Sequence, residues 1–131
     1  MKLNAVFCYI ACDVSITLAE QTSTIYEKKN YDVVMGGNDP IALGCIAAMQ
    51  MTDKTDQVMV YGVDGSPDGK AMIKAGFLEG TAAQSPIKIG EKAVQTAYSY
   101  LAGETVKKHV TIPVELITAD NLKFYDMTGW Q

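Results

Sequence analysis

Three polar side chains follow successive predicted strands, each at the point where a strand ends: Asn38, Asp64 and Gln84. An amide offers both a donor and an acceptor, and a carboxylate accepts hydrogen bonds at two oxygens. Together these groups suit neighbouring hydroxyls of a sugar, since each hydroxyl both donates and accepts. Ligands of an open parallel sheet bind just beyond the carboxyl ends of its strands, so we expect the three residues to form one site.

Each of these residues also has a purely structural interpretation. Asn38 and Asp39 can form a turn and a helix cap, and Asp64 with Gly65 is an ordinary turn pair. The residue types alone leave both interpretations open.

The sequence carries no arrangement typical of catalysis or of a bound cofactor. It contains neither GxSxG nor a phosphate-binding glycine loop, and the GVDG of residues 62–65 is too short for a dinucleotide fingerprint. His109 stands alone near a predicted edge strand, where we expect a surface or structural residue. We therefore expect a binding protein without a cofactor, and not an enzyme.

Three cysteines cannot all pair within one chain, and no CxxC or Cys/His spacing indicates zinc. Cys45 lies in an apolar helical stretch and is expected to be a small core residue. Cys8 and Cys12 are four residues apart with no further metal ligand nearby, and neither receives a role.

The elements that would position the polar residues repeat one pattern of strand, capping residue, proline and helix. The predicted strands are residues 15–19, 32–36, 57–63 and 80–84, with a last one within 109–119. The predicted helices start at Pro40, Pro67 and Pro86, after the possible caps Asp39, Ser66 and Ser85. Residues 20–30 give only a shortened crossover. This repetition predicts an α/β fold with an open, mostly parallel sheet and helices on both faces.

Several details refine that fold. The apolar run in 57–63 is typical of a parallel strand covered on both faces. Ile89, Ala93, Ala97 and Leu101 recur at fourfold spacing, which indicates an amphipathic helix that ends near Gly103. Pro113 places the last strand at an edge or a bulge.

Size and composition favour one ordinary globular domain. The chain has 131 residues, of which 48% are apolar and 20% charged, and no apolar run reaches the length of a membrane span. The net charge of −4 and the absence of a clustered basic patch argue against nucleic acid as a partner.

Residues 1–14 leave three interpretations open. Lys2 and a short apolar run that ends at Cys12 have the outline of a lipoprotein signal, although Asn4 and Tyr9 fit it poorly. The alternatives are a first strand or helical lead-in to the core, and an internal translation start.

The segments GGNDPIALG, VYGVDGSPDGKAMIKAG, GTAAQSPIKIGEKAV and PVELITADN resemble the C-terminal lobe of periplasmic sugar-binding proteins of the ribose/galactose type. These are substrate receptors of ABC importers with a type 1, Rossmann-like fold. The resemblance covers residues 15–131 and implies that Asn38, Asp64 and Gln84 contact a pentose or hexose. It also implies a stacking aromatic in the shortened crossover, for which Tyr26 is a candidate and Ile25 an equally plausible position.

In that family two lobes close on the sugar, whereas this chain corresponds to one of them. The resemblance implies that residues 119–131 cross to the other lobe, that the importer's membrane subunits are partners, and that the protein is periplasmic or at the cell surface. An exposed edge and an aromatic tail make a homodimer plausible. Two alternatives remain: the effector domain of a LacI-type regulator, and an enzyme of flavodoxin-like type.

Overall fold

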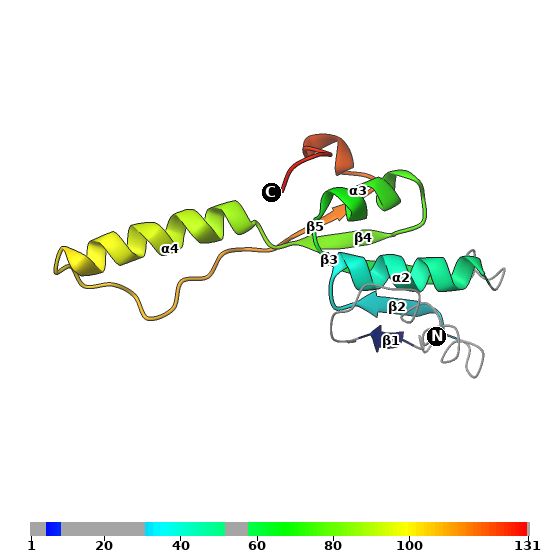
Figure 1. Cartoon of the computed structure of the whole chain (residues 1–131), viewed down its shortest axis with the longest axis horizontal. Coiled ribbons are helices and arrows are strands. Elements are labelled where there is room, and N and C mark those ends of the chain that lie inside the picture. Colours follow the sequence, from blue (N-terminus) through cyan, green and yellow to red (C-terminus); the bar gives the residue numbers. More distant parts are fainter. Residues whose placement is uncertain (1–4, 9–30, 52–57, 131) are drawn as a thin grey trace.

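A computed structural model describes residues 5–8, 31–51 and 58–130 of the chain. Five strands form one sheet whose spatial order follows the chain: β1 (Ala5–Cys8), β2 (Val33–Gly36), β3 (Met59–Asp64), β4 (Gly80–Ala83) and β5 (Glu115–Thr118). The first four strands are parallel and β5 is antiparallel to β4 (Figure 1). The predicted α/β class with an open, mostly parallel sheet is confirmed.

Two helices lie against one face of this sheet. Helix α2 (Asp39–Gln50) contacts β2 and β3, helix α3 (Pro67–Lys74) contacts β4, and the two helices contact each other. The third described helix, α4 (Pro86–Leu101), runs away from the sheet on the side of its carboxyl ends (Figure 1). The sequence predicts helices on both faces; among the described helices, those that cover the sheet lie on one face.

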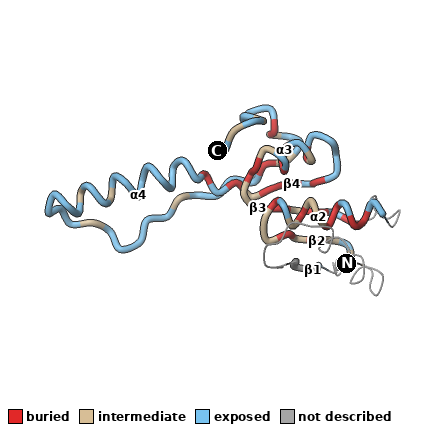
Figure 2. Tube along the Cα trace, viewed as in Figure 1, coloured by how far each residue is buried: buried red, intermediate tan, exposed pale blue. Residues whose placement is uncertain are grey.

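The core forms between the sheet and these two helices. Side chains along each strand point alternately to the two faces of the sheet, and those on the helix side are buried. They include Val34, Val60, Thr81 and Ile117, none of which is more than 1% exposed. Figure 2 shows buried residues in the sheet and the two helices, while α4 is almost entirely exposed. Along β3 the other side chains are less covered, and Met59 is 37% exposed. The sequence predicts that both faces of this strand are covered, and the described helices cover one of them.

Most predicted boundaries are within two residues of the observed ones, but one cap is wrong. Asn38, not Asp39, is the N-cap of α2, and Asp39 is the first helical residue. Ser66 caps α3 as predicted, whereas Ser85 precedes α4 without a capping hydrogen bond. β5 lies at the sheet edge, as Pro113 indicates. The predicted strand at 15–19, Cys12, Ile25 and Tyr26 lie outside the described residues.

Residues 5–8 form a strand, which is one of the interpretations left open for the N-terminal segment. Cys45 is fully buried in the core, as predicted, and His109 is exposed. In the described part of the chain, no helix is long and apolar enough to span a membrane.

The C-terminal segment packs against α3. Leu122, in the short helix η2 (Leu122–Phe124), joins the core, and the side chain of Lys70 donates hydrogen bonds to the carbonyls of Asp126 and Gly129. Lys70 is itself fully buried. The sequence gives this tail no place within the domain, and the structure supplies one; a crossing of residues 119–131 to a second lobe stays a prediction.

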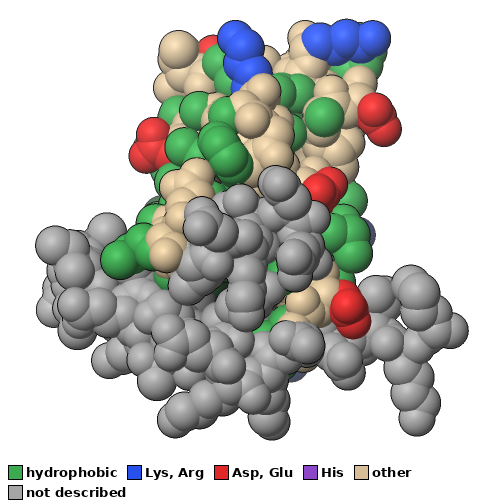
Figure 3. Space-filling model, turned by 90° about the vertical axis from the view of Figure 1, so that its right-hand side faces the viewer, with side chains coloured by type: hydrophobic (Ala, Val, Ile, Leu, Met, Phe, Trp, Pro, Cys, Tyr) green, Lys and Arg blue, Asp and Glu red, His purple; other side chains and the backbone are tan. Residues whose placement is uncertain are grey.

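The end of the molecule away from α4 shows no large patch of one charge. In the part of this face that Figure 3 colours, acidic side chains are scattered and hydrophobic side chains lie between them, with basic groups gathered near one end.

Candidate functional site

The sheet register brings the three predicted polar residues to one edge. Met35 of β2 pairs with Tyr61 of β3, so Asn38 and Asp64, each three residues further on, leave their strands at the same level. Asp64 pairs with Ala83, the residue before Gln84. The three residues thus lie at the carboxyl ends of three adjacent parallel strands, as the sequence predicts.

Asp64 and Gln84 are in direct contact. The Gln84 Nε2 donates a hydrogen bond to the Asp64 Oδ1 at 2.7 Å. Gln84 is exposed and Asp64 is half-buried, so the pair stands at the surface of the strand-end edge. This bond uses one donor of the amide and one oxygen of the carboxylate, and it leaves the Gln84 Oε1 and the Asp64 Oδ2 to accept further hydrogen bonds.

Burial raises the pKa of Asp64 above its ordinary value, and the nearby charge of Asp39 raises it further. Hydrogen bonds from Gln84 and from the backbone N–H of Asp39 oppose that rise. The Asp39 bond also shows that Asp64 lies beside the N-terminus of α2, next to Asn38.

Asn38 divides its side chain between two roles. Its Oδ1 accepts a hydrogen bond from the backbone N–H of Ile41 at 2.9 Å, which caps α2. Its Nδ2 has no partner in the part of the chain that the structure describes, and every buried side-chain nitrogen and oxygen there is hydrogen-bonded. The amide nitrogen therefore reaches the surface as a donor, so the structural and the ligand-binding interpretations of Asn38 are compatible.

Below these residues lies a buried network that sequence reasoning missed. Asp39 is fully buried, and its Oδ1 accepts from the Thr81 hydroxyl at 2.5 Å. Its Oδ2 accepts from the backbone N–H and the hydroxyl of Ser66, both at 2.7 Å. Thr81 also accepts from the backbone N–H of Gly65 at 3.0 Å. One carboxylate thus joins the corners after β2 and β3 to strand β4.

Two glycines make room for this carboxylate. A Cβ on Gly62 or on Gly69 would stand 2.3 Å from an Asp39 carboxylate oxygen. Gly62 and Gly69 lie 23 and 30 residues after Asp39, so only the fold shows that they face it. The sequence predicts a helix cap at Asp39, whereas the structure places its carboxylate at the centre of the corner packing.

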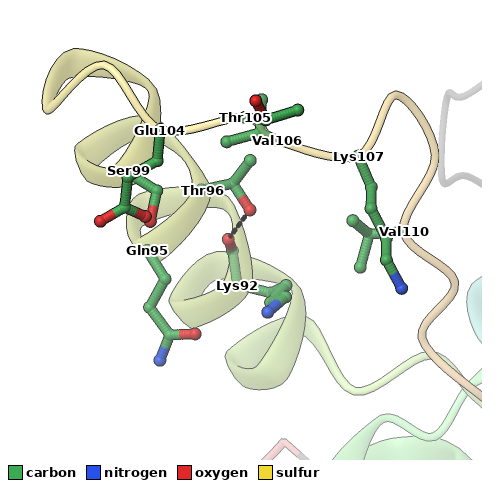
Figure 4. Close-up of a pocket in the computed structure, with 9 residues that line it drawn as sticks. All are labelled: Lys92, Gln95, Thr96, Ser99, Glu104, Thr105, Val106, Lys107 and Val110. Carbon is green, nitrogen blue, oxygen red and sulfur yellow. Dashed lines mark hydrogen bonds between the residues drawn. The ribbon is translucent and has the colours of Figure 1, made fainter.

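Other chemistry is sparse in the described ranges 5–8, 31–51 and 58–130. No group of three or more His, Cys, Asp or Glu side chains that could hold a metal ion occurs there. A hollow lies between α4 and the segment that follows it (Figure 4), and none of the three strand-end residues lines it.

The carboxyl ends of three parallel strands thus carry an amide, a carboxylate and a second amide, at the edge where open α/β sheets bind their ligands. The chain belongs to the periplasmic binding protein domain family, whose model matches residues 2–105.

Similar proteins include named sugar receptors. The chain is 43% identical over 84 residues to the ribose import binding protein RbsB of Escherichia coli, and the match covers 64% of this chain and 28% of that protein. It is 34% identical over 105 residues to the D-ribose/D-allose-binding protein of Pseudomonas aeruginosa, and the match covers 77% of this chain and 33% of that protein.

A similar solved structure is the ABC transporter solute binding protein of Bacillus halodurans with bound myo-inositol. It has a TM-score of 0.75 and 31% identity, and the match covers 82% of this chain and 38% of that one. The chain thus spans about a third of the length of the relatives that it matches. These relatives are named as binding proteins, in agreement with the binding role expected from the sequence.

Proposed function

We propose that this chain binds a monosaccharide, a pentose or a hexose, through Asn38, Asp64 and Gln84. The observation that carries the proposal is the hydrogen-bonded pair of Asp64 and Gln84 at the strand ends, level with Asn38, whose amide nitrogen has no partner among the described residues. The names of the relatives support it, since they include receptors for ribose and allose.

The chemistry of the three side chains fits a polyol. Asp64 accepts a hydrogen bond from a sugar hydroxyl, and Asn38 donates one to the oxygen of a neighbouring hydroxyl. Gln84 holds the carboxylate in place with its nitrogen and offers its oxygen to a further hydroxyl. A carboxylate that accepts from a hydroxyl forms a stronger hydrogen bond than a neutral acceptor, so Asp64 contributes most. Tyr26 remains the predicted stacking residue, from the resemblance alone.

The affinity of this arrangement is low, because one lobe covers one side of the sugar and leaves the other in water. A dissociation constant of about 1 mM corresponds to about −4.1 kcal/mol, and we expect this order for the chain alone.

The wider role is that of a substrate receptor of an ABC sugar importer, without enzymatic activity, in the periplasm or at the cell surface. The importer's membrane subunits are the expected protein partners. Pairing with a second copy of the chain belongs to the same proposal, since a second copy offers a further surface to the strand-end residues.

The test is a two-dimensional amide NMR titration of the chain with a panel of pentoses and hexoses, which detects millimolar binding. We expect shifts near Asn38, Asp64 and Gln84 for at least one sugar, and their loss in Asp64→Ala. Asp68→Ala is the matched control, because Asp68 is an exposed carboxylate four residues along the chain. Shifts that persist in Asp64→Ala, or no shifts with any sugar up to tens of millimolar, contradict the proposal.

A further inference from the structure

The corner after β3 is held in an unusual backbone conformation. The φ angles of Asp64 and Gly65 are both positive, at 118° and 71°. A residue with a Cβ is strained at such a φ, so contacts with the rest of the domain must hold Asp64 there. Because the carboxylate of the proposed sugar site is attached to this backbone, the same contacts decide where the carboxylate points.

The two backbone amides that follow Asp64 provide these contacts. The N–H of Gly65 donates to the Thr81 hydroxyl at 3.0 Å, and the N–H of Ser66 donates to the Asp39 carboxylate at 2.7 Å. Gly65 also lies close to β4, since a Cβ on it would stand 2.6 Å from a side chain of that strand. The corner therefore cannot relax to an ordinary φ without breaking a buried hydrogen bond.

The hydroxyls of Ser66 and Thr81 connect this corner to Asp39. The Ser66 hydroxyl accepts from the Gly69 N–H at 2.9 Å and donates to the Asp39 Oδ2 at 2.7 Å. The Thr81 hydroxyl accepts from the Gly65 N–H and donates to the Asp39 Oδ1. Because Asp39 is fully buried at the start of α2, its carboxylate fixes the positions of α2, the corner before α3 and β4 relative to one another.

Each of the three proposed ligand residues lies next to this network along the chain. Asn38 directly precedes Asp39, and Gln84 follows Thr81 by three residues. Asp64 directly precedes the two bonded amides, and its side chain also receives a hydrogen bond from the backbone N–H of Asp39. One buried carboxylate is thus connected to all three ligand side chains.

We propose that Asp39 is a positioning residue of the sugar site. Asp39 is fully buried and touches no ligand itself, but its network imposes the backbone conformation of Asp64. It thereby keeps Asp64 within hydrogen-bonding distance of Gln84 and beside Asn38. The inference rests on the proposed function and adds to it a residue that acts only through the others. A sugar meets side chains that are already in place, so binding does not have to order them.

The test changes Thr81, so that the Asp39 carboxylate itself stays in place. Thr81→Val keeps the shape of the side chain and removes the hydroxyl, so the Gly65 N–H loses its acceptor and Asp39 loses one donor. Thr81→Ser is the conservative variant, because it keeps the hydroxyl. Leu78→Ala is the control for lost stability, because Leu78 is a buried residue of the apolar core.

Two quantities are measured by NMR. The first is the conformation of Asp64, from the coupling between its amide proton and Hα and from its Cα and Cβ chemical shifts. The second is the dissociation constant for a sugar that binds the original chain. In Thr81→Val the conformation should change and the dissociation constant should rise about tenfold, whereas Thr81→Ser and Leu78→Ala should leave both unchanged. Asp39→Asn, measured where it is folded, should change both quantities in the same direction as Thr81→Val.

An unchanged conformation of Asp64 in Thr81→Val overturns the proposal, and so does a changed conformation with unchanged sugar affinity. An equal loss of affinity in Leu78→Ala also overturns it, because lost stability alone would then explain the effect. If the original chain binds no sugar, the proposed function fails, and the conformation of Asp64 in Thr81→Val still decides whether the network positions this residue.

Discussion

Replacing Asp39 by Asn should destabilise the fold strongly, although the change removes a single charge and almost no volume. The carboxylate accepts three hydrogen bonds from buried donors: the Ser66 N–H, the Ser66 hydroxyl and the Thr81 hydroxyl. An Asn side chain has one oxygen, so its NH₂ faces donors on the other side.

The magnitude follows from the donors left without an acceptor. If the remaining oxygen serves Thr81, the two donors of Ser66 lose their partner, at about 1–3 kcal/mol for each buried group. The Ser66 hydroxyl can turn and recover part of this, so we expect a loss of about 3 kcal/mol. That is a large share of the roughly 5–15 kcal/mol that stabilises an ordinary domain.

The measurement is urea unfolding followed by far-UV circular dichroism, with the free energy of unfolding taken from the midpoint at unchanged slope. Asp120→Asn is the control, because Asp120 is an exposed carboxylate in a turn, and it should change stability by less than about 0.5 kcal/mol. A loss below about 1 kcal/mol in Asp39→Asn would show that the network does not anchor the corners and would refute the reasoning.

Three further predictions concern the site and its supports. Because burial raises the pKa of Asp64, sugar affinity should fall on acidification already at a pH above the ordinary pKa of an aspartate. The effect on folding has the opposite sign, because protonation of a group with a raised pKa increases the free energy of unfolding. NMR titrations with sugar at a series of pH values test the first point, and a loss of affinity centred at or below the ordinary pKa of an aspartate would contradict it. Gly62→Ala should cost about 1–3 kcal/mol by urea unfolding, because its Cβ would meet the Asp39 carboxylate, and Gly90→Ala, where nothing lies near, should be neutral or stabilising. Lys70→Met removes two hydrogen bonds to carbonyls and should loosen the attachment of the C-terminal segment. Amide hydrogen exchange should become faster at residues 122–129 and stay unchanged in β2 and β3. Equal exchange rates at residues 122–129 in the variant and the original protein would contradict this prediction.

The part of the fold that the sequence predicts well is the part that local signals determine. Proline after Ser66 and after Ser85 marks helix starts, and runs of β-branched residues mark β2 and β3, so the elements and the sheet class follow. The strand-end positions of Asn38, Asp64 and Gln84 follow in turn, because a parallel sheet brings such residues to one edge.

What the sequence does not predict depends on contacts between distant segments. Asp39 bonds to residues 27 and 42 positions away, and Lys70 to carbonyls 56 and 59 positions away, so no local pattern shows that either is buried. The periodicity of α4 likewise does not predict the direction in which this helix runs. An amphipathic pattern says that one face of a helix will be covered, but not by which surface.

Asp64 has a φ of 118°, a backbone conformation that side-chain-bearing residues rarely adopt, and Gly65 beside it has a φ of 71°. A residue held in such a region costs of order 1–3 kcal/mol and persists where its surroundings impose it. Glycine at position 64 would remove that cost together with the carboxylate. If Asp64 binds a sugar as proposed, the residue that would make the chain most stable at this position and the residue that binds best are therefore different ones.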